Sequence, residues 1–158
     1  MSEFSKKYRE KLLPGQQHAF AGTDPEFIQI FESFAFDEVI HQGNLDDRTR
    51  FMAILAALLG CQGLEEFKMM LPAALNMGVT PVEVKEIVYQ SAAYLGIGRV
   101  FPFLKAVNEE LTSRGISLPL EGQSTTTPET RLTAGNQVQV DIFGEGMRDF
   151  QNSGPEES

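Results

Sequence analysis

Apolar residues recur at helical spacing through most of this chain, and glycine, proline and capping residues separate one such segment from the next. Between residues 27 and 111 apolar side chains return every three or four positions, which is the period of one helix face. The sharpest boundary is Thr80-Pro81-Val82-Glu83, where Thr80 predicts an N-cap and Glu83 the second half of a capping box. The expected helices cover residues 4–13, 25–42, 47–59, 63–77, 81–94 and 99–113. No segment predicts a strand, so the fold class is all-α.

The composition changes after Gly115. Residues 116–136 include the run STTTP and are typical of a linker. After this linker, Val138, Val140 and Ile142 alternate with polar residues, and the chain ends in NSGPEES. We therefore predict a helical domain over 1–115, a linker over 116–136, and a non-helical or loosely structured C-terminal tail over 137–158.

Charge and cysteine content exclude several classes of function. The net charge of -9 opposes binding to the phosphates of nucleic acids and to anionic membranes. No apolar run is long enough to cross a bilayer or to act as a signal peptide. With one cysteine and two histidines, the chain cannot form an internal disulfide or a Cys/His zinc site. We expect a cytoplasmic protein and predict no metal ligand and no cofactor.

Two segments carry a resemblance to a known family: LDDRTRFMAILAALLG at 45–60 and LPAALNMGVTPVEVKEIVYQSAAYLGIGRV at 71–100. Over about residues 27–112 the chain resembles the carboxymuconolactone decarboxylase family, which also contains the alkylhydroperoxidase D type proteins. The resemblance implies a helical bundle that assembles as trimers or hexamers, with sites between helices and near subunit interfaces. Because members also occur as tandem modules, residues 137–157 resemble the start of a second module.

Peroxidase relatives in this family place a C-x-x-C-x-x-x-H motif on the third helix, because one thiol attacks and the other resolves the mixed disulfide. Alignment on ALNMGVT puts Gly63, Glu66 and Met70 at those three positions. Cys61 lies outside this register and has no neighbouring histidine or arginine to favour its thiolate. Two-cysteine peroxidase chemistry is therefore not expected. The favoured role of Cys61 is structural, and a weak peroxidase activity that needs an external thiol remains the alternative.

The decarboxylase branch uses an E-x-x-x-H arrangement, in which a glutamate one turn before a histidine points both groups at one cavity. The resemblance places Glu66 at the glutamate position and Met70 at the histidine position. Such chemistry needs no cofactor, because the conjugated carbonyl of the substrate takes up the electrons. Glu66 is thus a candidate acid/base. The other interpretation, that Glu65 and Glu66 are N-terminal charges favoured by the helix dipole, stays open.

Arg48 and Arg50 both lie in the family pattern L-D-x-x-T-R, and one of them, Arg50 rather than Arg48, has two candidate roles. It could form a structural ion pair with Glu66 or Glu86, which is the favoured interpretation, or it could anchor a substrate carboxylate. Four further side chains are candidates for lining a substrate cavity. These substrate-binding candidates are Met70, Tyr94, Arg99 and Phe36.

These observations leave three functions open. The leading hypothesis is a decarboxylase-like lyase that moves protons on a small carboxylated lactone, with Glu66 and Arg50 as catalytic residues. The second is a non-catalytic oligomeric scaffold or small-molecule-binding protein. The third is a weak peroxidase acting through Cys61. In each case the expected partners are further copies of the chain, with a small carboxylated ligand in the first, and the sequence does not name a substrate.

Overall fold

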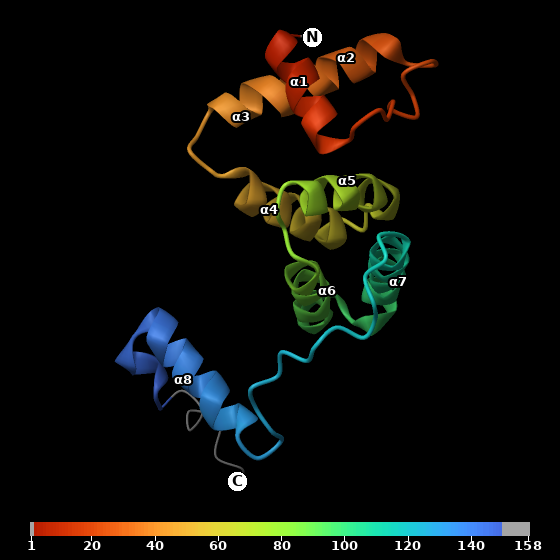
Figure 1. Cartoon of the computed structure of the whole chain (residues 1–158). Helices are drawn as coiled ribbons and strands as arrows, with labels where there is room; N and C mark the ends of the chain where they lie inside the picture. Colours follow the sequence, from red (N-terminus) through yellow and green to blue (C-terminus); the bar gives the residue numbers. More distant parts are fainter. Residues whose placement is uncertain (1, 150–158) are drawn as a thin grey trace. The chain divides into compact units, whose positions relative to one another are not determined.

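The computed structural model describes residues 2–149 as a set of helices (Figure 1). Their order and bounds are α1 Glu3–Leu12, α2 Pro25–Ser33, the π-helical turn η1 Phe34–Glu38, α3 Val39–His41, α4 Asp47–Gly60, α5 Leu64–Asn76, α6 Pro81–Leu95, α7 Ile97–Ser113, α8 Arg131–Phe143 and the 3-10 turn η2 Glu145–Met147. No strand occurs within the described residues, and the all-α prediction is confirmed.

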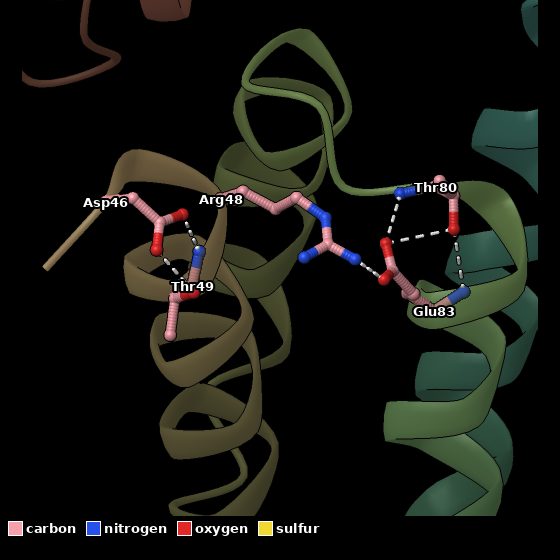
Figure 2. A network of polar contacts seen from close by, with 5 residues as sticks. All are labelled: Asp46, Arg48, Thr49, Thr80 and Glu83. Atoms are coloured by element: carbon pink, nitrogen blue, oxygen red, sulfur yellow. Dashed lines mark hydrogen bonds and ion pairs between the residues drawn. The ribbon is translucent and has the colours of Figure 1, made fainter.

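Helices α4 and α6 begin at the capping residues that the sequence predicts. The Asp46 carboxylate accepts hydrogen bonds from the backbone N–H of Thr49 at 3.0 Å and from its hydroxyl at 2.7 Å. The Thr80 N–H donates to the Glu83 carboxylate at 2.8 Å, and the Glu83 N–H donates to the Thr80 hydroxyl at 3.3 Å (Figure 2). The capping box is therefore confirmed. These bonds satisfy N–H groups that have no partner inside the helix.

Helices α4 to α7 form the centre of the first unit, which ends at residue 120. Helix α4 packs against α5 and α6, and α7 packs against the same two helices (Figure 1). The rings of Phe67 and Phe103 meet edge to face across this core, with centroids 5.1 Å apart. The large side chains that are fully buried here include Phe51, Phe67, Phe103, Leu55, Leu59, Leu71, Leu111, Val84, Val88 and Val107.

The N-terminal helix α1 packs against α5 and η1. Its Arg9 Nε donates to the buried carboxylate of Glu32 on α2 at 2.6 Å, and the Asn76 side-chain amide of α5 donates to the Leu12 carbonyl at 2.8 Å. The segment predicted as one helix over 25–42 contains the π-helical turn η1, which carries the buried ring of Phe36. These contacts hold α1 and η1 beside the α4–α5 pair.

The second unit begins at Glu121 and contains α8 and η2. Helix α8 Arg131–Phe143 begins inside the predicted linker and covers residues 137–143 of the predicted tail, so the prediction of a non-helical or loosely structured tail is wrong over 137–143. The alternation of Val138, Val140 and Ile142 does not have the period of a helix face, but an unpaired extended chain would leave its backbone N–H and C=O groups without partners. A helix satisfies those groups by itself. The predicted tail over 150–158 lies outside the described residues, and the resemblance to a second module stays a prediction.

Candidate functional site

A partly open pocket of about 340 Å³ lies in the first unit, a volume at the small end of the roughly 300–1,000 Å³ typical of ligand sites. Helices α4 and α5 contribute residues to it, and α1, α2, η1 and α3 add the rest. The lining residues are Tyr8, Phe31, Ala35, Phe36, Ile40, Arg50, Phe51, Ile54, Leu58, Glu66 and Met70. Apolar side chains thus surround one guanidinium and one carboxylate.

Glu66 and Met70 reach this pocket from the same face of α5 because they are one helical turn apart. Glu66 is half-buried, and its carboxylate forms no hydrogen bond or ion pair with any described residue. Met70 is 8% exposed and packs in the core cluster. Glu66 also lies in the first turn of α5, so the interpretation as a charge favoured by the helix dipole stays open.

Arg50 reaches the pocket from α4, and its guanidinium is only partly satisfied. The Nη2 group donates to the Leu45 carbonyl at 2.9 Å, whereas the buried Nε has no hydrogen-bond partner in the described part of the chain. The ion pair that the sequence suggested, with Glu66 or Glu86, is not formed. The neighbouring Arg48 makes the ion pair instead, with Glu83 at the start of α6 (Figure 2).

Tyr8 is a lining residue that the sequence analysis missed. Its ring is buried, and its hydroxyl donates to the Asp47 carboxylate at 2.6 Å. Burial, followed by the hydrogen bond and the charge of Asp47, raises the pKa of Tyr8 above its ordinary value. Lys11 also contacts Asp47, with its Nζ 3.2 Å from the second carboxylate oxygen. The sequence signal that could have identified Tyr8 as a lining residue was its position on the helix predicted over 4–13.

The structure brings Phe36 and Met70 to the pocket, together with Glu66 and Arg50. It does not bring Tyr94, Arg99 or Cys61 there. Tyr94 is 88% exposed and, like the exposed Arg99, lies near the junction of α6 and α7. Cys61 is exposed at the C-terminal end of α4, where its thiol contacts the Leu58 carbonyl at 3.4 Å.

A wider cleft of about 530 Å³ lies along α1 and α2. Its carboxylates already have partners, since Glu32 accepts from Arg9 and Glu10 accepts from the Gly15 N–H at 3.0 Å. The pocket lined by Arg50 and Glu66, whose charged groups are not fully paired within residues 2–149, is therefore the candidate site.

Residues 2–149 contain neither a metal-ligand cluster nor a helix fit to span a membrane. Within this range no group of three or more His, Cys, Asp or Glu side chains is arranged to hold a metal ion. Over the same range, no helix combines the length and the apolar character that crossing a membrane requires.

The fold and the pocket define a class: helical bundles that enclose a small apolar site with one acidic and one basic side chain. The model of the carboxymuconolactone decarboxylase family matches residues 25–109, and the chain belongs to this family. The 4-carboxymuconolactone decarboxylase of Acinetobacter baylyi is 33% identical over 72 residues, which cover 46% of this chain and 54% of that relative. The chain thus spans about half the length of the curated relative. No solved structure matches.

Proposed function

We propose that this protein catalyses cofactor-free proton transfer, coupled to decarboxylation, on a small carboxylated lactone or related acid. One observation carries the proposal: Glu66 and Arg50, from different helices, line one partly open pocket that is otherwise almost entirely apolar. An apolar site strengthens the interaction of charged groups with a bound substrate, because little water competes for them. Membership of the carboxymuconolactone decarboxylase family supports the same class of reaction.

The chemistry follows from the two charged groups. Arg50 would hold a substrate carboxylate through its guanidinium N–H groups. As the bond to the departing carbon dioxide breaks, its electron pair would pass into the conjugated carbonyl of the lactone. Glu66 would then relay a proton from water to the resulting carbanion centre, and the hydroxide left by the water would combine with the carbon dioxide. Atoms and electrons balance without an external oxidant or reductant.

The test compares Glu66→Gln with Glu65→Gln, a matched change at the neighbouring residue. Glu65 is an exposed glutamate that pairs with Lys68 at 2.7 Å and does not line the pocket. Candidate lactone acids are incubated in D₂O, and deuterium incorporation and carbon dioxide release are followed by NMR and mass spectrometry. We expect Glu66→Gln to lower turnover by about 10²–10⁴-fold and Glu65→Gln to leave it unchanged. Equal activities of the two variants would contradict the assignment of Glu66.

The binding-protein alternative uses the same pocket without chemistry. It predicts that a carboxylated ligand binds the wild-type protein and the Glu66→Gln variant equally, with no turnover in either. The peroxidase alternative depends on Cys61, whose exposed thiol is accessible to peroxide. A Cys61→Ser variant that consumes peroxide as slowly as the wild-type protein would eliminate that alternative.

We further propose that the chain forms a homo-oligomer and is cytoplasmic. Supporting self-association, α2 and η1 expose an apolar stripe at helical spacing: Phe27, Ile30, Phe31 and Phe34. The single cysteine favours a reducing compartment. Light scattering after size exclusion should give a trimer or hexamer, and Phe27→Asp should shift the protein toward the monomer.

A further inference from the structure

Two separate surfaces of the first unit expose large apolar side chains. The first, called the α2 face, lies on α2 and η1 and consists of Phe27, Ile30, Phe31 and Phe34. The second, called the α6–α7 face, consists of Tyr89, Ile97 and Phe101. Each of these side chains keeps between 38% and 67% of its surface exposed. Clusters of this kind are typical of surfaces that another protein covers.

The α6–α7 face is continuous across its two helices because Lys85 of α6 connects them. Its Nζ donates to the side-chain oxygen of Asn108 on α7 and lies 5.8 Å from the centroid of the Tyr89 ring. Ile97, Phe101 and Asn108 share one side of α7, because they are separated by about one and two turns. The side chains of the α6–α7 face therefore form one surface.

The α6–α7 face carries positive charge on an otherwise acidic protein. Lys85 is buried, and no carboxylate within residues 2–149 pairs with it. Lys105 lies one turn after Phe101 and is exposed, with only a long contact of 3.8 Å to Glu109. A buried positive charge without a counter-ion makes the surface above it attractive to an acidic partner.

The α2 face carries the opposite charge. Residues 24–40 contain five carboxylates and no lysine or arginine. Glu26 lies one turn before Ile30 and Glu38 lies four residues after Phe34, and both glutamates are exposed and pair with no described residue. Two α2 faces in contact would bring these carboxylates together, and like charges across an interface lower the affinity. The α2 face therefore matches the α6–α7 face in charge and does not match itself.

We propose, on the basis of the homo-oligomer proposed above, that the α2 face of one copy binds the α6–α7 face of the next copy. The exposed apolar side chains of the two faces pack together, and Glu26 and Glu38 face the positive charges of Lys85 and Lys105. Each copy thus uses two different faces. Such a head-to-tail contact closes into a ring where the rotation between neighbouring copies permits it.

The first test blocks one face at a time in the full chain and measures the mass of the particles by sedimentation velocity. Phe34→Asp blocks the α2 face, and Phe101→Asp blocks the α6–α7 face. Both side chains are more than half exposed, so the fold should tolerate the changes, which circular dichroism checks. We expect each variant alone to be a monomer and their equimolar mixture to form 1:1 dimers, because each variant keeps the face that the other lacks. Either variant assembling alone, or a mixture that stays monomeric, would overturn the proposal.

The second test exchanges charges and leaves the apolar side chains in place. Lys105→Glu should weaken association by about fivefold or more, and adding Glu38→Lys to the same chain should restore it. The control is Lys7→Glu on α1, outside both faces. Lys7 has the same 78% side-chain exposure as Lys105 and a similar contact, 3.9 Å from Glu3 one turn away. Lys7→Glu should keep the wild-type affinity within about twofold. Equal losses in the two lysine variants would show an effect of net charge and contradict the contact.

The wild-type protein separates this inference from the homo-oligomer itself. If it is a monomer, the proposed homo-oligomer fails, and the contact between the two faces fails with it. If it is an oligomer that Phe101→Asp leaves intact, the homo-oligomer stands and the head-to-tail contact fails. Turnover of lactone acids tests the proposed chemistry and decides neither of these points.

Discussion

Helix α4 carries Arg48 and Arg50 of the L-D-x-x-T-R pattern on two different faces. The polar contacts of Arg48 are complete, and those of Arg50 are not. Arg48 pairs with Glu83, which is itself held by the Thr80 capping box, so this side of the helix is a closed polar network (Figure 2). Arg50 lines the pocket, and neither its buried Nε nor the Glu66 carboxylate of the same pocket has a partner among residues 2–149. Residues two apart on a helix point about 200° away from each other, so both arginines cannot serve one site.

The comparison indicates that a polar side chain has a structural role where its hydrogen bonds are complete, and a ligand-binding role where they are not. A polar group whose bonds are complete within the fold stabilises the fold and has no capacity left for a ligand. A buried polar group without a partner lowers the stability of the free protein, and a ligand of opposite charge removes that deficit. The Arg48 side therefore holds α4 to α6, and the Arg50 side is the proposed binding side.

The largest expected effect is on the rate of proton transfer, when a histidine is added to the pocket. Met70→His would place an imidazole one turn after Glu66, restoring the spacing of the decarboxylase branch. We expect proton transfer to a lactone acid to rise by about 10²-fold. The unfolding free energy should fall by about 1–3 kcal/mol, because a polar ring replaces a buried thioether.

The control is Met69→His, at the adjacent and less buried position, which does not line the pocket. This variant should show the wild-type rate. If Met70→His and Met69→His have the same proton-transfer rate, Glu66 does not act together with position 70. The pocket side of α4 would then have no catalytic role that the Arg48 side lacks.

The second effect is on the stability of the protein and concerns Tyr8, the residue of α1 that lines the pocket. Tyr8→Phe removes the buried hydroxyl that donates to Asp47 at 2.6 Å, and chemical denaturation should show a loss of about 1.5–3 kcal/mol. Because the pKa of Tyr8 in the folded protein lies above its ordinary value of 10.0, the unfolded chain loses this proton first as the pH rises. Wild-type stability should therefore fall above that pH more steeply than the stability of Tyr8→Phe. Equal slopes would mean that Tyr8 does not carry the alkaline response.

Local signals made most of the first unit predictable. Thr80, Pro81 and Glu83 specify the start of α6 by themselves, since the capping box depends only on neighbouring residues. The helical spacing of Phe51, Leu55 and Leu59 likewise predicted the buried face of α4. Helix α8 was missed, because the composition after Gly115 is typical of a linker and the alternating apolar residues do not follow the period of a helix face.

The candidate site was less predictable, because it depends on contacts between residues far apart in the sequence. Glu66, Met70, Arg50 and Phe36 were identified as candidates from the family pattern, and the structure brings them to one pocket. The pairing of Tyr8 with Asp47 spans 39 positions and leaves no local signal. Sequence spacing also could not decide which arginine pairs, since that depends on where α6 begins relative to α4.

The third effect tests the closed network on the other side of α4. Thr80→Ala removes the hydroxyl that caps α6 and contacts Glu83 at 2.9 Å. The unfolding free energy should fall by about 1 kcal/mol, as measured by denaturant titration, with ligand binding unchanged. A Thr80→Ser variant keeps the cap and should retain wild-type stability. Altered turnover of a lactone acid by Thr80→Ala would show that the two sides of α4 are coupled.

The smallest expected effect gives the most direct comparison of the two faces of α4. The same substitution, arginine to methionine, should change the unfolding free energy differently on each face. Arg48→Met removes a half-exposed ion pair and should lower stability by about 0.2–1 kcal/mol, less at high salt. Arg50→Met removes a buried Nε that has no partner and leaves the exposed Leu45 carbonyl to water, so stability should stay the same or rise. Thermal unfolding of both variants at two salt concentrations measures the difference. A loss in Arg50→Met larger than in Arg48→Met would mean that Arg50 is a structural residue, because a group kept for a ligand should cost the free protein nothing when it is removed.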